Sequence, residues 1–509
     1  MMVRKSIDIF MRWYLAQRYK RIKRYMDFPV LVQERWLDHM KTAASFTEWG
    51  KKYDFSKVKT RKDFAACMPI QDYESLKPYI DRMMLGESDV LWGGEIKWFS
   101  KSSGTTNSKS KYIPVSSQNL KHCHIKGTWD TMSIIYNQLP HATQFRYKTL
   151  LMGGCIDLVQ GNPRARTGDV SAIMIEHMPR IARPFFTPDF EIALMKDFEK
   201  KLEIKATILA KEKDMVMIGG VPTWLIVLFR KILEKTGKEN MLEVWPNLQV
   251  YTHGGVSFAP YKKQFAQFFP GDQVKYFEIY NASEGYFGMQ HGVDDDDMLL
   301  LMDSGVYYEF LPQSEWYKEN KETIFLEDIE IGKNYALVIS TNAGLWRYTT
   351  GDTISFTSTK PFRFKITGRI NQFVNAFGEE VIVENTDKAL AKTCEVMPCA
   401  IADYTVAPKY FEGNNKGGHE WLIEFKTPPQ DLDLFTSLLD ENLKKLNSDY
   451  EAKRFNDLAL LPLKISSLPP GTFSKWFKSK GRYTTQAKVP RLANHREYVD
   501  DILQILHSS

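Results

Sequence analysis

The sequence predicts an α/β fold built on a parallel β-sheet, followed by a smaller α+β domain. Three observations support this prediction. A central region alternates short apolar runs with helical patterns, which is typical of strand–helix–strand units with parallel strands. The length of 509 residues exceeds what one hydrophobic core usually holds. The composition also changes after residues 369–377, so we expect domains at residues 1–370 and 371–509.

The central region begins with a charged segment at 189–211 that has the pattern of one long helix. Residues 215–218 then form a short apolar run that ends in two glycines, the pattern of a strand buried on both faces. Pro222 begins a second helix with apolar side chains at helical spacing, and Gly237 stands where a helix ends. A strand followed by a crossing helix is therefore expected here.

Two further strands, at 248–252 and 274–280, repeat this plan, and a helix with three aromatic residues joins them. Successive units of this kind imply right-handed crossovers and a parallel sheet. In such sheets ligands bind beyond the carboxyl ends of the strands. The loops that follow the three strands, at 219–220, 253–255 and 281–285, are therefore expected to line one face.

The segment 371–509 has the size of an ordinary domain. It contains a strand-like stretch at 419–425 after a glycine-rich turn, and a helical pattern at 433–450 with apolar residues on one face. A small α+β domain is the fold that this pattern favours.

Residues 97–115 place hydroxyl side chains, a glycine and lysines in one loop between two strand-like segments. Glycine lets backbone N–H groups face an anion, hydroxyls add donors, and lysine adds positive charge. The loop is not a Walker A sequence, because Pro114 lies where that motif would continue as a helix. The composition indicates a nucleotide-phosphate loop, and the alternative is a solvated Ser/Thr/Lys turn.

Two acidic side chains further along the chain fit such a site. Glu284 lies in the turn after the third parallel strand, and a carboxylate beside a phosphate loop is the hard oxygen ligand that Mg²⁺ prefers. Asp352 follows a glycine between two strand-like segments, and it can accept two hydrogen bonds from a ribose diol. The alternatives are a solvated loop acid and an aspartate in an ordinary hairpin.

Composition excludes several classes of protein. The balance of 68 basic and 62 acidic residues gives a net charge of only +6, which does not indicate a nucleic-acid partner. Five cysteines without a CxxC pair favour a reducing compartment, so a cytoplasmic location is expected. No apolar run approaches the ~20 residues of a transmembrane helix.

The first 24 residues contain eight basic residues against a single acid, Asp8, interleaved with Ile7, Phe10, Trp13, Leu15 and Tyr19. A helix of this composition can lie on a membrane surface. The favoured interpretation is a helix whose aromatic face packs on the body of the protein, because neither a signal-peptide core nor a small-residue cleavage site follows.

In their order along the chain, these motifs resemble those of the adenylate-forming superfamily, which includes acyl-CoA ligases, peptide-synthetase adenylation domains and luciferases. The resemblance is greatest to the GH-three (auxin-responsive promoter) branch of acyl acid amido synthetases. Residues 102–111 resemble the phosphate loop, 280–285 the acidic motif, 348–352 the ribose motif and 368–378 the hinge, while 67–80 and 97–99 resemble this branch in particular.

The resemblance implies a large N-terminal domain with parallel β-sheets sandwiched by helices and a β-barrel-like subdomain, and a smaller, mobile α+β C-terminal domain. It also implies a two-step reaction. ATP and a carboxylic acid give acyl-AMP and pyrophosphate, and the amine of an amino acid then gives an amide and AMP. ATP and Mg²⁺ are the expected cofactors. A small carboxylic acid and an amino acid are the expected partners, and a monomer is expected.

The resemblance further implies roles for individual residues. Lys488 and Lys111 are the expected catalytic residues, and Glu284 is the expected metal ligand. The expected ATP-binding residues are Ser102, Ser103, Gly104, Thr105, Thr106, Ser283, Asp352 and Arg369. The expected substrate-binding residues are Val221, Trp224, Thr252, Gly254, Gly255 and Tyr280.

The sequence departs from the superfamily pattern at three places. Asn107 replaces the second glycine of the phosphate loop, Asn371 stands where the hinge usually has aspartate, and residues 377–380 lack the lysine of plant members. Lys488 matches through the basic, Pro-Arg character of its loop. Two alternative functions remain, an acyl-CoA ligase and a non-catalytic nucleotide-binding protein of the same fold.

Overall fold

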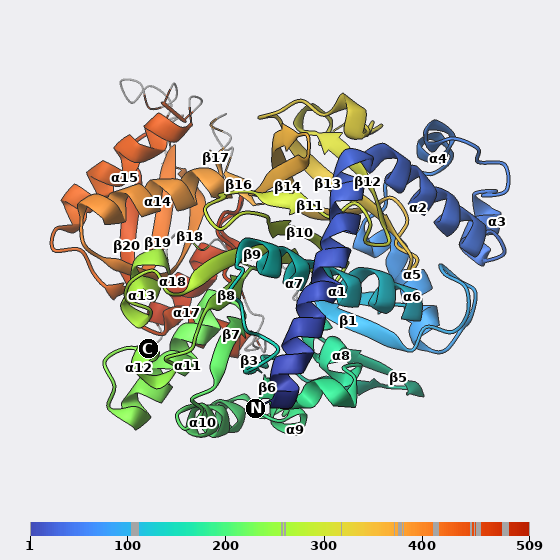
Figure 1. Cartoon of the computed structure of the whole chain (residues 1–509). Helices are drawn as coiled ribbons and strands as arrows, with labels where there is room; N and C mark the ends of the chain where they lie inside the picture. The colour runs from blue at the N-terminus through green and yellow to red at the C-terminus, as the bar shows by residue number, and fades with distance from the viewer. Residues whose placement is uncertain are drawn as a thin grey trace.

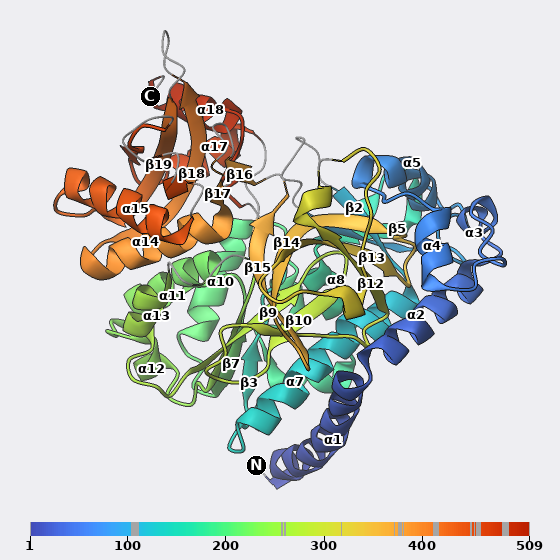
Figure 2. The same ribbon diagram turned by 90° about the horizontal axis from the view of Figure 1, so that it is seen from above.

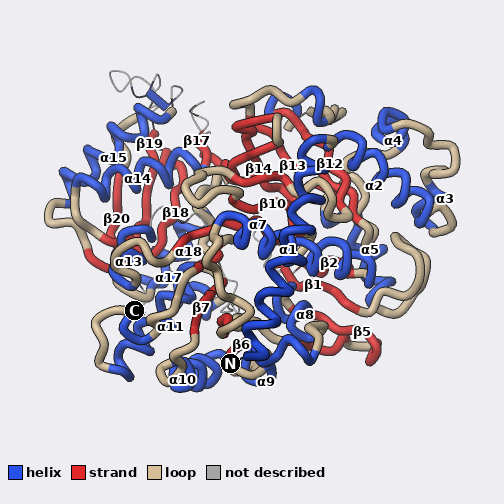
Figure 3. Tube along the Cα trace, viewed as in Figure 1, coloured by secondary structure: helices blue, strands red, loops and turns tan. Residues whose placement is uncertain are grey.

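The structure confirms the predicted fold class, because it is a mixed α/β protein with one large sheet, a four-stranded sheet in the order β2-β1-β5-β4 and a smaller C-terminal sheet (Figure 1). Helices lie mostly outside the strands of the large sheet (Figure 3). The structure is a computed structural model, and it describes residues 2–102, 111–255, 258, 261–316, 318–370, 372–374, 379, 381–410, 417–447, 450–451, 454, 460–480 and 488–507.

The described helices are α1 (Met2–Asp27), α2 (Pro29–Ala44), α3 (Glu48–Lys52), α4 (Arg61–Cys67), α5 (Tyr73–Met84), α6 (Ser117–Asn119), η1 (Leu120–Ile125), α7 (Lys126–Gln138), α8 (Val170–Glu176), η2 (Arg180–Phe185), α9 (Phe190–Ala193), α10 (Phe198–Leu209), α11 (Pro222–Thr236), α12 (Met241–Val244), α13 (Lys262–Phe268), η4 (Gln313–Glu315), η5 (Leu326–Asp328), α14 (Val383–Val396), α15 (Leu432–Leu446), α17 (Thr472–Ser479) and α18 (Glu497–His507).

The described strands are β1 (Trp98–Ser102), β2 (Lys111–Val115), β3 (Lys148–Leu150), β4 (Ile156–Val159), β5 (Asn162–Gly168), β6 (Phe186–Thr187), β7 (Met215–Gly219), β8 (Val250–His253), β9 (Lys275–Asn281), β10 (Tyr286–Gln290), β11 (Met298–Leu300), β12 (Val306–Pro312), β13 (Asn334–Thr341), β14 (Tyr348–Thr359), β15 (Phe362–Arg369), β16 (Phe373–Val374), β17 (Val381–Ile382), β18 (Ala400–Tyr410), β19 (Gly417–Thr427) and β20 (Lys464–Leu468).

The large sheet has a parallel and an antiparallel half, in the strand order β12-β13-β14-β15-β11-β10-β9-β8-β7-β3-β6. The strands β9, β8, β7, β3 and β6 pair in parallel, as predicted for the first three. The change of direction occurs where β9 pairs antiparallel with β10. The carboxyl ends of the parallel strands therefore lie next to the antiparallel half of the sheet, near the junction of β9 and β10. The candidate site lies there.

The crossing helix α11 forms where the sequence predicts it. Pro222 occupies the first turn, where its missing N–H costs no hydrogen bond, and Gly237 ends the helix with a φ of 65°. Leu225, Leu228 and Phe229 are buried, and they belong to a core shared with α13 and the parallel strands. This core fixes the helix whose N-terminus lies at the carboxyl ends of the strands.

Two predicted elements differ in the structure. The charged segment at 189–211 is not one helix but two, α9 and α10, because the Asp197 side chain accepts a hydrogen bond from the Lys200 N–H and begins a new helix there. Asp352 lies within the continuous strand β14 and not on a turn between two strands. Gly351, at a φ of 81°, permits an irregularity of the backbone immediately before it.

The C-terminal elements form a sheet of their own in the order β18-β19-β20. The helices α14 and α15 share one core with it, and α17 and α18 share another. Seen from above, these elements lie beside α11 and α13 of the larger part (Figure 2). The side chain of Lys426 donates a hydrogen bond to Gln264 of α13, at 2.9 Å. The exact boundary of the two predicted domains stays a prediction.

The helix α1 packs against the body along one face only. Leu15, Tyr19 and Ile22 are buried, and Arg18 forms an ion pair with Asp130 of α7 at 2.6 Å. The favoured prediction that the aromatic residues pack on the body holds for Tyr19 but is wrong for Trp13 and its neighbour Phe10, which are exposed. Among the described helices, none combines the length and apolar character that a bilayer-spanning segment needs.

Candidate active site

The carboxyl ends of β7, β8 and β9 lie side by side, as the loop prediction requires. Gly219 pairs with Thr252 on the neighbouring strand, and the N–H of Gly220 donates to Thr252 O at 3.1 Å. A Cβ on Gly254 would lie 2.3 Å from the carbonyl oxygen of Ile279. Only glycine therefore fits at this position, and the three strand ends form one compact edge.

The C-terminal part of the chain places Lys488 at this edge. Gly255 has a φ of 80°, and a Cβ on it would lie 3.3 Å from Lys488 Nζ and 3.5 Å from Val221 Cγ2. The structure thus brings together three of the predicted site residues. Thr252 is buried, and its hydroxyl donates to Ile218 O at 3.4 Å, so its side chain supports the strand edge.

Backbone contacts to β18 position Lys488. The hydroxyl of Thr405 donates to Pro490 O at 2.6 Å, and the N–H of Val406 donates to Arg491 O at 2.8 Å. The β18 strand in turn meets the larger part, where the Tyr261 hydroxyl at the start of α13 donates to Ala402 O at 3.5 Å. The place of Lys488 therefore depends on how the C-terminal sheet docks on α13.

Asp352 is the centre of a buried polar cluster. It pairs with Arg369 across β14 and β15, and Arg369 Nε lies 2.7 Å from Asp352 Oδ1. The hydroxyl of Tyr280 donates to the other carboxylate oxygen. The attraction of Asp352 is the main cause that raises the pKa of Arg369. Arg369 and Tyr280 thereby hold the Asp352 carboxylate in one orientation. Its oxygens still have lone pairs that can accept a hydrogen bond from a ligand hydroxyl.

Glu284 lies next to this cluster in the tight turn between β9 and β10, which a hydrogen bond from the Ala282 N–H to Gly285 O closes at 2.8 Å. Burial, and then the charge of Asp352, raises the pKa of Glu284, while Arg369 and Lys111 lower it. Within the described ranges the Glu284 carboxylate forms no ion pair. A partly buried carboxylate without a cationic partner is available for a ligand.

A second buried group beside Glu284 lacks a partner. Tyr348 is fully buried, and its hydroxyl has no hydrogen-bond partner among the described residues. Burial and the charge of Glu284 raise its pKa. Buried polar groups in proteins are normally paired. A buried hydroxyl without a partner, beside a carboxylate without an ion pair among the described residues, therefore indicates that the site is shaped for a bound group.

The two ends of the predicted phosphate loop close onto the same site. Ser102 of β1 pairs with Lys111 of β2 at the base of a hairpin. The N–H of Tyr112 donates to the Tyr73 hydroxyl at 2.9 Å, and Lys111 Nζ lies 5.6 Å from the centre of the Tyr73 ring. Ser102 and Ser283 are half-buried. The remaining predicted loop residues, Ser103, Gly104, Thr105 and Thr106, lie outside the described residues.

Trp224 lines a hollow with Met152 and Leu228, between α10, α11 and the loop after β3, and Met152 also lies beside Gly220 of the strand edge. The ammonium groups of Lys201 and Lys205 close this hollow. Lys201 donates to the carbonyl oxygens of the loop at 2.7 and 2.8 Å, and burial lowers the pKa of Lys205 to about 7. Sequence reasoning missed both lysines, because a lysine in a charged helix gives no sign of being buried.

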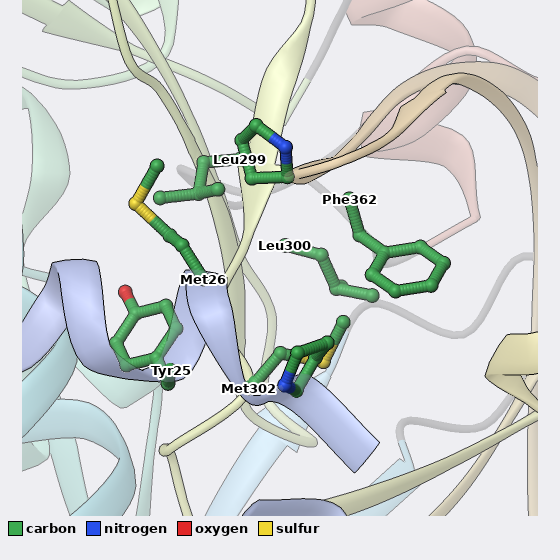
Figure 4. Close-up of a pocket in the computed structure, with 8 residues that line it drawn as sticks. Tyr25, Met26, Leu299, Leu300, Met302 and Phe362 are labelled. Carbon is green, nitrogen blue, oxygen red and sulfur yellow. The ribbon is translucent and has the colours of Figure 1, made fainter.

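Another hollow lies elsewhere in the fold (Figure 4). It is lined by apolar residues of α1, β11 and β15, among them Met26, Leu300 and Phe362. Phe362 and Arg369 stand at opposite ends of β15, and seven residues of extended strand separate them by about 23 Å. The hollow is therefore distant from the polar cluster and is not part of the candidate active site.

The described residues contain no group of three or more His, Cys, Asp or Glu side chains arranged to hold a metal ion. Mg²⁺ bound with a nucleotide needs only one or two carboxylates, since phosphates and waters supply the other ligands. The unpaired carboxylate of Glu284 fits this requirement, whereas both oxygens of Asp352 already have protein partners.

The Lys488 ammonium titrates in an accessible pH range. The residue as a whole is exposed, but the many atoms around its ammonium group, and then the positive charge of Arg369, lower its pKa to about 8. We expect the kcat/KM of a reaction that uses this positive charge to fall as the pH rises through about 8. Lys488→Arg keeps its charge throughout this range, so its profile should stay flat there. A profile that falls equally in both proteins would contradict the assignment.

A buried ion pair that sequence reasoning missed supports the start of β14. Arg347 Nη2 lies 3.0 Å from Glu309 Oε1, both side chains are buried, and Arg347 has a φ of 44°. Its guanidinium also donates to the carbonyl oxygens of Ala65 and Met68. The arginine therefore ties the segment before α5 to the strand that carries Asp352.

Removing one partner of this pair should destabilise the fold. Arg347→Ala leaves the Glu309 carboxylate buried without a cation, and we expect a loss of about 3–5 kcal/mol in the free energy of unfolding. Arg82→Ala, which removes exposed ion pairs with Glu48 and Glu87, should cost less than about 1 kcal/mol. Urea unfolding of the two variants measures the difference. Equal losses in the free energy of unfolding would show that the buried pair stabilises the fold no more than the exposed pairs do.

Comparison with sequence models of known families gives matches along most of the chain. The GH3 family N-terminal domain matches residues 18–239 and 211–274, the GH3 family central domain matches 299–369, and the GH3 family C-terminal domain matches 384–497.

Two curated relatives are similar over nearly their full length. The indole-3-acetic acid-amido synthetase GH3.3 of Arabidopsis thaliana is 24% identical over 548 residues, which cover 92% of this chain and 89% of the relative. The 4-substituted benzoates-glutamate ligase GH3.12 of the same plant is 23% identical, with 90% and 92% covered.

Two solved structures share the fold. The GH3.15 acyl acid amido synthetase has a TM-score of 0.76 at 17% identity, with 93% of both chains covered. A 2-hydroxyisobutyryl-CoA ligase in the postadenylation state, in complex with R3-HIB-AMP, has a TM-score of 0.53 at 13% identity, with 99% of this chain and 92% of the other covered.

Proposed function

This chain belongs to the GH3 family, and from that premise we propose that it is an ATP-dependent acyl acid amido synthetase. It activates a carboxylic acid as acyl-AMP and transfers the acyl group to the amine of an amino acid. The observation that carries the proposal is the convergence of Lys488, the Asp352–Arg369 pair and Glu284, which has no ion pair among the described residues, at the carboxyl edge of the parallel sheet.

In the first step, a carboxylate oxygen of the acid attacks the α-phosphorus of ATP, and pyrophosphate leaves. We propose that Asp352 accepts hydrogen bonds from the ribose hydroxyls, with Arg369 holding its carboxylate in place. Lys488 and Lys111 donate to phosphate oxygens and stabilise the negative charge that develops there. Ser102, Ser283 and the loop residues 103–106 supply further donors to the phosphates.

Mg²⁺, when bound, neutralises charge on the departing pyrophosphate, and Glu284 is the side chain that would hold it. The Tyr348 hydroxyl has no partner among the described residues and is influenced by the charge of Glu284, and we propose that it donates to a phosphate oxygen or a bound water. These two groups contribute positioning in the first step.

In the second step, the amine nitrogen of the amino acid attacks the acyl carbonyl carbon of acyl-AMP. AMP leaves with the electron pair of the broken acyl–oxygen bond, and the nitrogen loses a proton. We propose that Val221, Trp224, Gly254 and Gly255 line the acyl group, with Tyr280 at the phosphate end.

One assay tests the proposal. The purified protein is supplied with ATP, labelled pyrophosphate and a panel of aromatic, indole, jasmonate-like and fatty acids, and acid-dependent label exchange into ATP is measured. Amino acids or CoA are added afterwards. Exchange followed by amide supports the synthetase, whereas thioester without amide selects an acyl-CoA ligase. A folded protein that supports no exchange with any acid is a non-catalytic nucleotide-binding protein.

We further infer that the domains divide at 370 and 371, that the protein is a cytoplasmic monomer, and that the C-terminal part moves between the two steps. The last inference rests on the polar character of the described contacts between the β18–β19 region and α13, such as those of Lys426 with Gln264 and of Tyr261 with Ala402. Polar interfaces between domains of one chain permit their relative motion.

A further inference from the structure

The outward face of α1 carries a cluster of large apolar side chains. Ile9 and Phe10 are each 59% exposed and Trp13 is 60% exposed, and the rings of Phe10 and Trp13 lie 6.0 Å apart. The view from above places the helix at the periphery of the molecule (Figure 2). The family match begins only at residue 18, so neither the fold core nor the proposed reaction accounts for this apolar cluster.

Basic side chains continue the same face toward the C-terminal end of α1. Lys20, Arg21, Lys23 and Arg24 are exposed, and none of them forms an ion pair with a described residue. A helix turns about 100° per residue, so Ile9, Trp13 and Lys20 point to the same side within about 40°. The apolar cluster and the basic cluster are therefore parts of one surface.

Acidic side chains are nearly absent from this surface. Of the two acids in α1, Asp8 is buried and forms ion pairs with Arg12 and Arg146. The other, Asp27, is the last residue of the helix. The exposed face therefore carries cationic and apolar side chains, with the neutral Gln17 among them and no acid before Asp27.

We propose that α1 is a membrane-surface helix that docks the protein on an anionic lipid bilayer. The helix lies in the plane of the interface, with Ile9, Phe10 and Trp13 inserted among the acyl chains and Lys20 to Arg24 on the lipid phosphates. Indole and phenyl rings favour the interface, and lysine and arginine extend their heads to it. Each basic residue adds attraction to an anionic leaflet.

A bilayer fits this surface better than a protein partner does. Charged residues, lysine above all, are depleted in the cores of protein interfaces, whereas here lysine and arginine make up half of the face. The apolar side chains stand on a convex helix and not in a groove, which suits a fluid surface that closes around them. The proposal is independent of the reaction assigned to the active site.

Vesicle flotation with the full-length protein tests the proposal. Phosphatidylcholine vesicles with phosphatidylserine should carry the protein, phosphatidylcholine alone should not, and high salt should release it. Phe10→Ser with Trp13→Ser should weaken binding by at least about tenfold, and Lys20→Glu with Lys23→Glu should abolish the dependence on phosphatidylserine. Binding that is absent in the wild type, or unchanged in these variants, overturns the proposal.

Matched controls keep the test specific. Leu85→Ser removes another apolar side chain, 65% exposed at the end of α5, and Lys200→Glu with Lys211→Glu reverses two exposed charges on and after α10. Both should bind as the wild type does. Adenylation activity and thermal unfolding should be the same in all variants. A wild type that dimerises, with a monomeric Phe10→Ser, Trp13→Ser variant, would show that a second copy covers the face and would overturn membrane docking.

Insertion has its own readout. The chain has 12 tryptophans, and lipids brominated on the acyl chains quench only those that enter the bilayer. Trp13→Phe should still bind phosphatidylserine vesicles but lose the quenching that the wild type shows. Quenching that persists in Trp13→Phe would contradict insertion by this face. Heparin is a polyanion without acyl chains, so binding to heparin that depends equally on Phe10 and Trp13 would also contradict insertion.

Discussion

Glu284→Ala is expected to abolish acid-dependent ATP–pyrophosphate exchange. Glu284 is the carboxylate of the site that forms no ion pair within the described part of the chain, while both oxygens of Asp352 have partners. Loss of this proposed metal ligand removes the charge compensation for departing pyrophosphate, and we expect a decrease of at least about 10³-fold. Exchange is measured at saturating ATP over a range of Mg²⁺ concentrations. Near-normal exchange would refute the role.

The stability of the Glu284 variants separates a functional from a structural role. The folded protein raises the pKa of Glu284, so the ionised carboxylate is less favourable in the folded than in the unfolded state. This cost to the stability of the fold is present at pH values above the raised pKa. It is lost as the pH falls below the ordinary pKa of a glutamate. Glu284→Gln should therefore keep or raise the midpoint of thermal unfolding at neutral pH while losing exchange. A lowered midpoint would show that the carboxylate stabilises the fold.

Lys488→Ala is expected to slow adenylation by about 10²–10³-fold while the binding of ATP changes little. Its ammonium lies at Gly255 and senses the charges of Asp352 and Glu284, so it is placed to stabilise charge that develops in the transition state. An interaction made mainly in the transition state lowers kcat and kcat/KM together. Rapid-mixing measurements of acyl-AMP formation report the rate, and ATP affinity is measured separately.

The second half-reaction supplies a control for Lys488. When chemically prepared acyl-AMP is supplied, Lys488→Ala should form amide at a rate close to that of the wild type, because no phosphate transfer remains. Lys475→Ala removes an exposed lysine of the same C-terminal part and should leave both steps intact. Equal loss of both steps in Lys488→Ala would indicate that the lysine supports the docking of the C-terminal sheet and not adenylation.

Local patterns predicted most of the elements that build the site. The sequence predicted the strand at 215–218, the helix from Pro222 to Gly237 and the glycine edge. These features depend on apolar periodicity and helix-end residues, which act over a few neighbouring positions. The break in 189–211 was missed, since a single side-chain cap at Asp197 outweighed a continuous helical pattern. The position of Asp352 within the strand β14 was missed, because the residues that pair with this strand lie in β13 and β15.

Contacts between distant residues were beyond local patterns. Arg347 and Glu309 are separated by 38 positions in the sequence, with the strand β13 between them, and neither gives a sign in the sequence of being buried. The meeting of Lys488 with Gly255 depends on the docking of the C-terminal sheet on α13. The exposure of Phe10 and Trp13 likewise depends on which face of α1 packs against α7.

The sequence by itself determined the fold class, the family and the residues able to carry adenylation chemistry, because these depend on residue type, spacing and order. The tertiary structure decided which of these residues meet. It left Glu284 without an ion pair among the described residues, gave both oxygens of Asp352 a partner, and brought Lys488 to the strand edge. The reason is physical: burial, pKa and pairing are set by atoms that approach from distant parts of the chain, and no local pattern encodes them.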